Sequence, residues 1–362
     1  MSVTRLSEAL DKIRPADAAA KRRARARQRS LTKPPGSLGR LEDISVQLAG
    51  IFGTDRPEVR GRTVVIAAAD HGVVARGISG YPQEVTNQMV RNFLADGAAI
   101  SVLTRHLGVR RIIVDAGVAG ELPPSSEIRT LRIGRITGDI SQGPAMSRTQ
   151  AEQCIGAGID LAAEVAATGA DLIGTGDMGI GNTTPSSAIV AALTGTPPAA
   201  ATGRGTGRSP AELARKIAVV QQALEVNKPA PEDPVDVLAK VGGFEIGVLA
   251  GLVLGGAMMR RVVVLDGFIS GAAALIACTL SPHARDYLVA SHRSAEKGHR
   301  AVLSHLKLRP LLDLGMRLGE GTGAVLAMPV IEGAAACLAG MATFAEAGVS
   351  GHGARAERED RR

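Results

Sequence analysis

Apolar positions along the chain alternate between short runs rich in β-branched residues and longer stretches with helical spacing. The short runs are residues 63–69, 110–117, 170–176 and 261–267. The helical patterns cover about residues 82–107, 148–167 and 268–280. Continuous apolar runs are typical of buried parallel strands, and the helices between them supply the crossovers. We predict an α/β fold: a doubly wound, Rossmann-like parallel sheet with helices on both faces.

The two ends of the chain differ from this core. Residues 1–30 are charged with a helical pattern, and from about residue 324 the pattern is again purely helical. We therefore expect segments 1–55 and 323–362 to form a small helical domain. Residues 56–322 would form the large nucleotide- and base-binding domain.

Composition narrows the classes of partner. The chain has 362 residues, 45% of them hydrophobic, which is enough for a large core. Only 2% are aromatic, which argues against a nucleic-acid binder that stacks bases on rings. The net charge is +7, and the obvious clusters of charged residues are at 21–27 and 354–362, which are typical of solvated ends. We expect no nucleic-acid partner, while a small anionic substrate would suit a basic protein.

Cysteines and apolar segments indicate the compartment. Cys154, Cys278 and Cys337 are odd in number and far apart, which argues against disulfides and zinc and predicts buried thiols in a reducing cytosol. The N-terminal residues carry charges throughout and lack an apolar signal core. The most apolar stretch, 246–259, is shorter than the roughly 20 residues that span a bilayer. We predict a cytoplasmic protein without a membrane partner, and a buried helix at 246–259.

Glycine-rich loops follow the predicted strands, where ligands bind in such sheets. Residues 174–184 read GTGDMGIGNTT and formally match a dinucleotide fingerprint. That fingerprint needs an acidic residue about 20 positions on, but residues 185–211 contain none, which argues against a dehydrogenase. Glycines and hydroxyl side chains at a helix start instead predict a monophosphate site.

A second glycine loop, residues 203–207, precedes another helix start. Ser209 and Glu212 form a capping box around Pro210, a proline favoured at the first helical position. This arrangement places Lys216 one to two turns into the helix. Together the two loops predict a cradle for one anionic ligand.

Glu320 stands between two glycines in GMRLGEGTGA, residues 315–324, ahead of an apolar run. An acid near a helix start can simply be favoured by the helix dipole. In a pocket that binds an aromatic ring, a carboxylate is instead partly desolvated, its pKa rises, and it becomes a better proton acceptor. Both interpretations are open from this stretch alone.

Several sequence blocks together resemble one family. The blocks are TKPPGSLGRLE, AADHGVVARGISGYPQEVTNQM, GDMGIGNTT, GRGTG, SHRSAEKGH, MRLGEGTGA and MATFAEAGVS, running from residue 32 to residue 350. In this order they resemble the nicotinate-nucleotide:dimethylbenzimidazole phosphoribosyltransferases of cobalamin biosynthesis. The resemblance implies a homodimeric enzyme that converts nicotinate mononucleotide and 5,6-dimethylbenzimidazole into α-ribazole 5'-phosphate and nicotinate. Residues 1–30 and 351–362 match no block.

The resemblance and the loops together give the expected site residues. Glu320 is expected to be the general base, and Asp177 is a candidate for catalytic support. The expected phosphoribosyl-binding residues are Gly176, Gly179, Gly181, Asn182, Thr183, Thr184, Gly203, Gly205, Gly207, Lys216, Asp266 and Ser294. The expected acceptor-base-binding residues are Ser79, Tyr81, Gln88, Met178 and Leu318.

The chemistry explains why so few groups are needed. In the donor the ribose is joined to a pyridinium nitrogen, which leaves as neutral pyridine without a metal or protonation. One base then suffices to remove the acceptor's ring N–H proton. We expect no metal and no cofactor, and inversion from β to α. Two alternatives stay open: a sister transferase with another base or a phenol as acceptor, and a non-catalytic nucleotide-binding protein on the same fold.

Overall fold

The computed structural model describes residues 2–205 and 209–350. The chain divides into two compact units, Met1–Arg14 with Gly61–Met328 and Pro15–Arg60 with Pro329–Arg362. This grouping differs from the expected one at three places: residues 1–14 and 323–328 belong with the large unit, and residues 56–60 belong with the small one. In the large unit α1 (Ser2–Lys12) packs against α6 (Arg148–Ala167). The domain boundaries proposed from the sequence otherwise stay a prediction.

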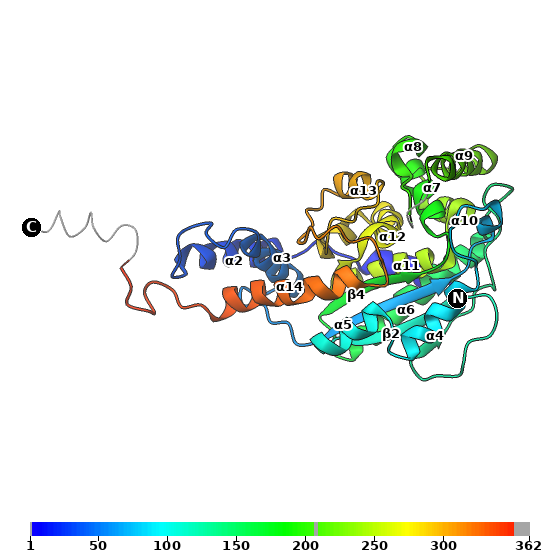
Figure 1. The fold of residues 1–362 in the computed structure, drawn as a ribbon. Helices are drawn as coiled ribbons and strands as arrows, with labels where there is room; N and C mark the ends of the chain where they lie inside the picture. Colours follow the sequence, from blue (N-terminus) through cyan, green and yellow to red (C-terminus); the bar gives the residue numbers. More distant parts are fainter. Residues whose placement is uncertain (1, 206–208, 351–362) are drawn as a thin grey trace, which may run out of the picture. The chain divides into compact units, whose positions relative to one another are not determined.

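The first unit is built on a six-stranded parallel sheet with strand order β3-β2-β1-β4-β5-β6 (Figure 1). The strands are β1 (Arg62–Ala69), β2 (Arg110–Gly117), β3 (Ile128–Thr130), β4 (Leu172–Met178), β5 (Val262–Leu265) and β6 (Leu288–Ala290). The four long apolar runs of the sequence are β1, β2, β4 and β5, while the three-residue strands β3 and β6 were too short to be predicted. Strand order reverses between β1 and β4, the position where ligands bind in such sheets.

Helices cover both faces of this sheet, as predicted (Figure 1). One face carries α4 (Val85–Leu94) and α5 (Ala99–Leu107), and the other carries α11 (Phe244–Met258) and α12 (Gly267–Leu280). The helix predicted at 246–259 is α11, which is buried along almost its whole length between the sheet and α6. Glycines allow this close packing, because a Cβ on Gly251 would lie 2.0 Å from the carbonyl oxygen of Ile155.

The single helix predicted at 82–107 is wrong, because two helices stand there. The chain leaves α4 after Leu94 and enters α5 at Ala99. Asp96 between them has φ +58°, a left-handed conformation that interrupts a right-handed helix. Apolar spacing alone did not reveal this break, since the short link preserves the periodicity.

Among the remaining helices of this unit, the start of α9 was predictable from its cap. The N-terminus of α9 (Pro210–Asn227) has the predicted capping box between Ser209 and Glu212. The other helices are α7 (Thr183–Thr194), α8 (Pro198–Ala201), α10 (Pro234–Val241), α13 (His299–His305), η1 (Gly72–Arg76) and η2 (Pro282–Tyr287). Of the three free cysteines, Cys154 is buried as expected, whereas Cys278 and Cys337 are only half-buried.

The second unit is helical. It contains α2 (Ala18–Ser30), α3 (Arg40–Phe52) and the part of α14 (Thr322–Gly340) that follows Pro329. Their shared core consists of Ala24, Leu31, Val46, Ala49 and Leu338. The expectation of helix to the C-terminus is wrong for residues 341–350, which turn and pair with the chain at Leu31 instead.

In the described part of the chain, α14 alone is long and apolar enough to cross a membrane by length and composition. Half of its most apolar window is buried inside the protein. Glu332 and the interior Pro329 also interrupt its apolar surface. We therefore interpret α14 as a core helix.

Candidate active site

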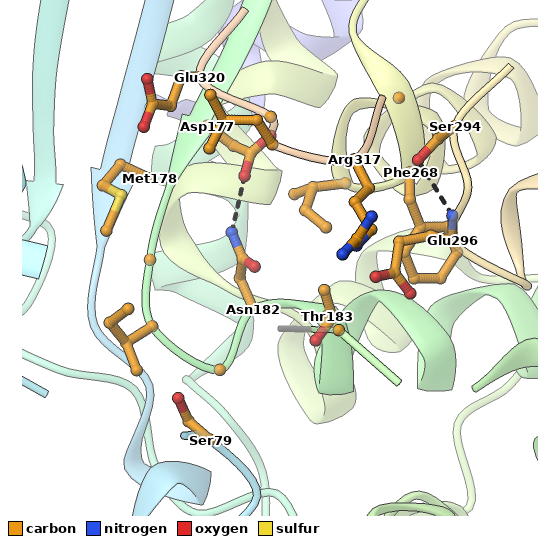
Figure 2. Close-up of a pocket in the computed structure, with 18 of the residues that line it drawn as sticks. Ser79, Asp177, Met178, Asn182, Thr183, Phe268, Ser294, Glu296, Arg317 and Glu320 are labelled. Atoms are coloured by element: carbon orange, nitrogen blue, oxygen red, sulfur yellow. Dashed lines mark hydrogen bonds between the residues drawn. The ribbon is translucent and has the colours of Figure 1, made fainter. Parts of the chain in front are cut away.

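A cavity of about 700 Å³ opens beyond the carboxyl ends of β4 and β5 in the first unit (Figure 2). Most of the predicted site residues line it. These residues are Ser79, Tyr81, Asp177, Met178, Gly179, Gly181, Asn182, Thr183, Gly205, Lys216, Asp266, Ser294, Leu318 and Glu320. Segments more than 200 residues apart in sequence thus meet at one edge of the sheet, where parallel strands all end.

Four predicted residues stand outside the lining. Gly176 lies under the backbone of Glu320, and Thr184 is fully buried in α7. Gly203 contributes its carbonyl oxygen, which lies 3.5 Å from Lys216 Nζ. Gln88 is exposed on α4, whereas Val85 and Met89 of the same helix line the cavity. Gly207 lies outside the described residues.

Charged and aromatic side chains that the sequence reasoning missed also line the cavity. They are Arg204, Phe268, His292, Glu296 and Arg317. Arg204, Glu296 and Arg317 each fall within one of the blocks that carry the family resemblance, so charge inside a glycine-rich block was the available signal. Phe268 gave no signal, because it reads as the first apolar residue of a buried helix.

One end of the cavity is built at the start of α7. Lys216 Nζ donates a hydrogen bond to Thr183 Oγ1 at 2.6 Å, although the lysine is only 2% exposed. Gly181 has φ +88°, which lets the loop turn directly into the helix start. Backbone N–H groups at a helix N-terminus and a buried ammonium are well suited to a phosphate.

Asp177 ends β4 with half of its carboxylate unused. Its Oδ2 accepts a hydrogen bond from Asn182 Nδ2 at 2.9 Å (Figure 2). Its Oδ1 is buried and has no hydrogen-bond partner among the described residues. Burial, followed by the nearby carboxylate of Asp266, raises the pKa of Asp177 well above its usual range, while the bond from Asn182 opposes this.

Glu320 occupies a strained turn just before α14. Its φ is +62°, and Gly319 and Gly321 on either side have φ +79° and +91°. The side chain is 4% exposed, and Oε2 has no hydrogen-bond partner in the described part of the chain. Burial raises the pKa of Glu320 from 4.5 to about 6, against the lowering effect of the Ile100 backbone N–H. A carboxylate with this pKa is ionised at neutral pH and can still accept a proton readily.

Asp266 follows β5 and faces the same turn. Its Oδ2 accepts from the backbone N–H of Gly321, and its Oδ1 accepts from Gly323 and Ala324. Burial raises the pKa of Asp266 to about 7 even though these three bonds favour the charged form. Three protein donors therefore already occupy the carboxylate that the sequence analysis expected to bind the phosphoribosyl group.

The rest of the lining is largely apolar. It includes Ile78, Val85, Met89, Met178, Ile180, Phe268 and Ile269. Tyr81 and Leu318 are 53% and 57% exposed, so each places a large apolar surface at the lining and in contact with solvent. An apolar pocket with a few placed polar groups is typical of a site for an aromatic ligand. Among the residues that the structure describes, no group of three His, Cys, Asp or Glu side chains is arranged to hold a metal.

Comparison with known families defines the class of protein first. A family model described as phosphoribosyltransferase matches residues 13–349. This match covers most of both compact units and every cavity residue named above.

Individual relatives make the class more specific. The chain is 59% identical over 346 residues to nicotinate-nucleotide–dimethylbenzimidazole phosphoribosyltransferase of Roseiflexus castenholzii, covering 96% of this chain and 98% of that protein. It is 50% identical to the Geobacter sulfurreducens protein of the same name, covering 96% of this chain and 99% of that protein. A crystal structure of CobT from Thermus thermophilus superposes with a TM-score of 0.89 at 48% identity, covering 92% of this chain and 99% of that one. The chain belongs to the nicotinate-nucleotide–dimethylbenzimidazole phosphoribosyltransferase family, as the sequence blocks indicated.

Proposed function

We propose that this protein transfers the phosphoribosyl group of nicotinate mononucleotide to 5,6-dimethylbenzimidazole, a step in assembling the nucleotide loop of cobalamin. The products are α-ribazole 5'-phosphate, nicotinate and a proton. One observation carries the proposal: a buried carboxylate with an unpartnered oxygen, Glu320, lines the same cavity as the anion-binding start of α7. A base and a phosphate site in one cavity are the two elements that this reaction needs.

The donor phosphate is proposed to bind at Thr183, Lys216, Ser294 and the loop of Gly203 and Gly205. Lys216 supplies positive charge, and Arg204 and Arg317 add more at the lining. The donor's ribose would then lie near Asp177, whose Oδ1 is available to accept a hydroxyl hydrogen. The acceptor ring would lie against the apolar lining that includes Met178 and Leu318.

Glu320 is proposed to remove the acceptor's ring proton while the other ring nitrogen attacks the anomeric carbon. The attack would come from the face opposite nicotinate, which inverts the configuration from β to α. The C–N bond to nicotinate breaks as the new C–N bond forms, and the electron pair returns to the pyridinium nitrogen. The proton from the acceptor moves to Glu320 and then to water. We further expect a cytoplasmic homodimer that needs no metal or cofactor.

The test incubates the purified protein with nicotinate mononucleotide and a panel of acceptors. The panel is 5,6-dimethylbenzimidazole, benzimidazole, adenine and phenol, with products identified by mass and by NMR of the anomeric proton. We expect nicotinate release and an α-configured product, formed fastest with 5,6-dimethylbenzimidazole. A faster reaction with adenine or phenol would make the protein a sister transferase. A β-configured product would exclude direct inversion, and no nicotinate release with any acceptor would refute the proposed activity.

A further inference from the structure

We propose that Asp266 is a positioning residue: it fixes the backbone turn that carries Glu320 and acts on the reaction through Glu320. This inference rests on the proposed function, in which Glu320 is the base. It differs from the sequence expectation, which assigned Asp266 to the phosphoribosyl group.

The carboxylate of Asp266 accepts three hydrogen bonds, all from backbone N–H groups of residues 321–324, just after Glu320. Oδ2 lies 2.8 Å from the backbone nitrogen of Gly321. Oδ1 lies 2.8 Å from that of Gly323 and 3.2 Å from that of Ala324. The first N–H groups of a helix have no partner within the helix and need an outside acceptor. A carboxylate from another strand end thus caps α14 and holds the residue next to Glu320.

The turn needs such support because its backbone conformation is unfavourable. A non-glycine residue with φ +62°, as at Glu320, costs on the order of 1 kcal/mol and persists where its surroundings determine it. Thr322 closes the turn from within, since its N–H and its Oγ1 both donate to the carbonyl oxygen of Gly319. The turn also packs directly against the backbone of β4, because a Cβ on Gly176 would lie 2.7 Å from the carbonyl oxygen of Glu320. Asp266 adds the third contact that holds this turn, through its hydrogen bonds to the backbone N–H groups after Glu320.

Asp266 is itself held rigidly. It is fully buried, and its own backbone N–H donates to Thr175 Oγ1 on β4 at 3.1 Å. His292 Nδ1 lies 3.7 Å from Oδ1, and burial lowers the pKa of this histidine, which favours its neutral form. The other titratable groups that face Asp266 are the carboxyls of Asp177 and Glu320. No side chain with a resident positive charge appears among these neighbours, so the backbone N–H groups carry the stabilisation of the carboxylate.

Two acids that must both be ionised leave a signature in the pH dependence. Asp266 must be ionised to accept from all three N–H groups, and Glu320 must be ionised to accept the acceptor's proton. Their pKa values are raised to about 7 and about 6, so both ionise as the pH rises through this range. The acid limb of kcat should therefore be steeper in the wild type than a single ionisation allows.

The experiment is a double-mutant cycle of Asp266→Asn and Glu320→Gln. An asparagine has one carbonyl oxygen, and its amide NH₂ would face a backbone N–H, so the turn loses support while side-chain volume is kept. We expect Asp266→Asn to lower kcat by about 10²-fold, the effect of a misplacement of about 1 Å, with the KM for nicotinate mononucleotide changed less than about threefold. In the Glu320→Gln background the same change should have almost no further effect. The acid limb of Asp266→Asn should also fall to a single ionisation.

Two further variants guard against a purely structural explanation. Asp171→Asn is the matched control. Asp171 directly precedes β4, at the amino ends of the strands and away from the cavity, and it accepts a hydrogen bond from Arg261 at 2.6 Å. The control should leave kcat unchanged. Thr175→Val removes the acceptor for the Asp266 N–H without touching any carboxylate, and it should lower kcat by about threefold to tenfold. This variant keeps the inference testable should Asp266→Asn fail to fold.

The outcomes separate this inference from the proposed function. Full turnover by Glu320→Gln would refute the base assignment and this inference with it. A slow Glu320→Gln with an unaffected Asp266→Asn would refute the positioning role alone. Effects that multiply in the double variant, or a KM for nicotinate mononucleotide raised tenfold or more, would place Asp266 on the donor instead.

Discussion

The aspartates at the ends of two neighbouring strands, Asp177 within the last residues of β4 and Asp266 directly after β5, are both buried at one cavity yet differ in their partners. Asp266 accepts three backbone hydrogen bonds. Asp177 accepts one from Asn182 and keeps an oxygen without a partner among the described residues. The saturated carboxylate shapes the protein, and the unsaturated one is available to a ligand. Position after a strand therefore does not define the role of an aspartate, whereas its hydrogen-bond partners do.

The turn that carries Glu320 lies against both aspartates, and its two sides differ in the same way as the aspartates do. Toward Asp266 its backbone is fixed by hydrogen bonds, and toward Asp177 a Cβ on Gly319 would lie 3.2 Å from Oδ1. Asp266 holds the backbone next to Glu320 in place, while Asp177 Oδ1 and Glu320 Oε2 have no hydrogen-bond partner among the described residues. A rigid backbone with an available carboxylate oxygen suits a preorganised proton acceptor. Burying these charges costs stability, as is common at functional sites.

Among changes that leave the Glu320 side chain in place, the largest effect is expected from displacing its backbone. Gly176→Ala would place a Cβ 2.7–2.8 Å from backbone atoms of Glu320 and Gly321, which cannot give way without moving the turn. We expect kcat to fall by about 10²-fold. Gly174→Ala on the same strand is the matched control, since its Cβ would meet side-chain atoms, the nearest being Met328 Cε at 3.0 Å. Steady-state kinetics of both variants decide, and equal losses would contradict a special role for the Glu320 backbone.

The next effect concerns the stability cost of burying the Glu320 carboxylate, whose Oε2 has no hydrogen-bond partner among the described residues. The folded-state pKa of Glu320 is about 6 against an ordinary 4.5, so the folded state binds a proton more tightly than the unfolded one. The free energy of unfolding should then fall as pH rises from about 4.5 to about 6, by about 2 kcal/mol. Glu320→Gln removes this cost, so it should be more stable than the wild type at pH 7.5 by about that amount.

Urea unfolding of the wild type and of Glu320→Gln at pH 7.5 and at pH 4.5 measures this difference in the free energy of unfolding. At pH 4.5 the wild type and Glu320→Gln should differ little, because the glutamate is then largely protonated in the folded protein. A variant that is less stable than the wild type at pH 7.5 would show that the carboxylate contributes to stability, contrary to its unpartnered environment.

The smallest effect is expected on the ligand side. Asp177→Asn keeps one oxygen that can accept from Asn182 but replaces the free acceptor with an N–H donor. We expect kcat/KM for nicotinate mononucleotide to fall by about tenfold, the size of one lost hydrogen bond to a charged group. The free energy of unfolding should not fall, because a buried charge is removed. Lost stability with unchanged kinetics would instead make Asp177 a purely structural residue.

Sequence reasoning predicted the β4 side of the site well because its signals are local. The loop from Gly174 to Thr184 is a continuous stretch whose glycines, hydroxyls and helix start are adjacent in sequence, and the capping box at Ser209 is equally local. Glu320 stood out as an isolated acid between glycines, whereas its expected role as the base came from the family resemblance. Parallel strands follow from apolar runs of seven or eight residues, which explains why β1, β2, β4 and β5 were found and the three-residue strands β3 and β6 were missed.

The hydrogen-bond partners of Asp266 could not be predicted, since Gly321, Gly323 and Ala324 lie 55 to 58 residues further on. Its sequence context, an aspartate after a strand, is the same as that of Asp177. The exposed position of Gln88 depends on the rotation of α4, which the break at Asp96 allows to differ from that of α5. Hydrogen bonds and helix rotation are tertiary properties, and a motif does not encode them locally.

The most direct test of the central claim, that Glu320 is the proton acceptor for phosphoribosyl transfer, is the turnover of Glu320→Gln. The change keeps the volume and polarity of the side chain and removes its ability to take a proton at neutral pH. With nicotinate mononucleotide and 5,6-dimethylbenzimidazole, kcat should fall by about 10²- to 10⁴-fold while the KM of the donor changes by less than about threefold. Turnover equal to that of the wild type would contradict the claim.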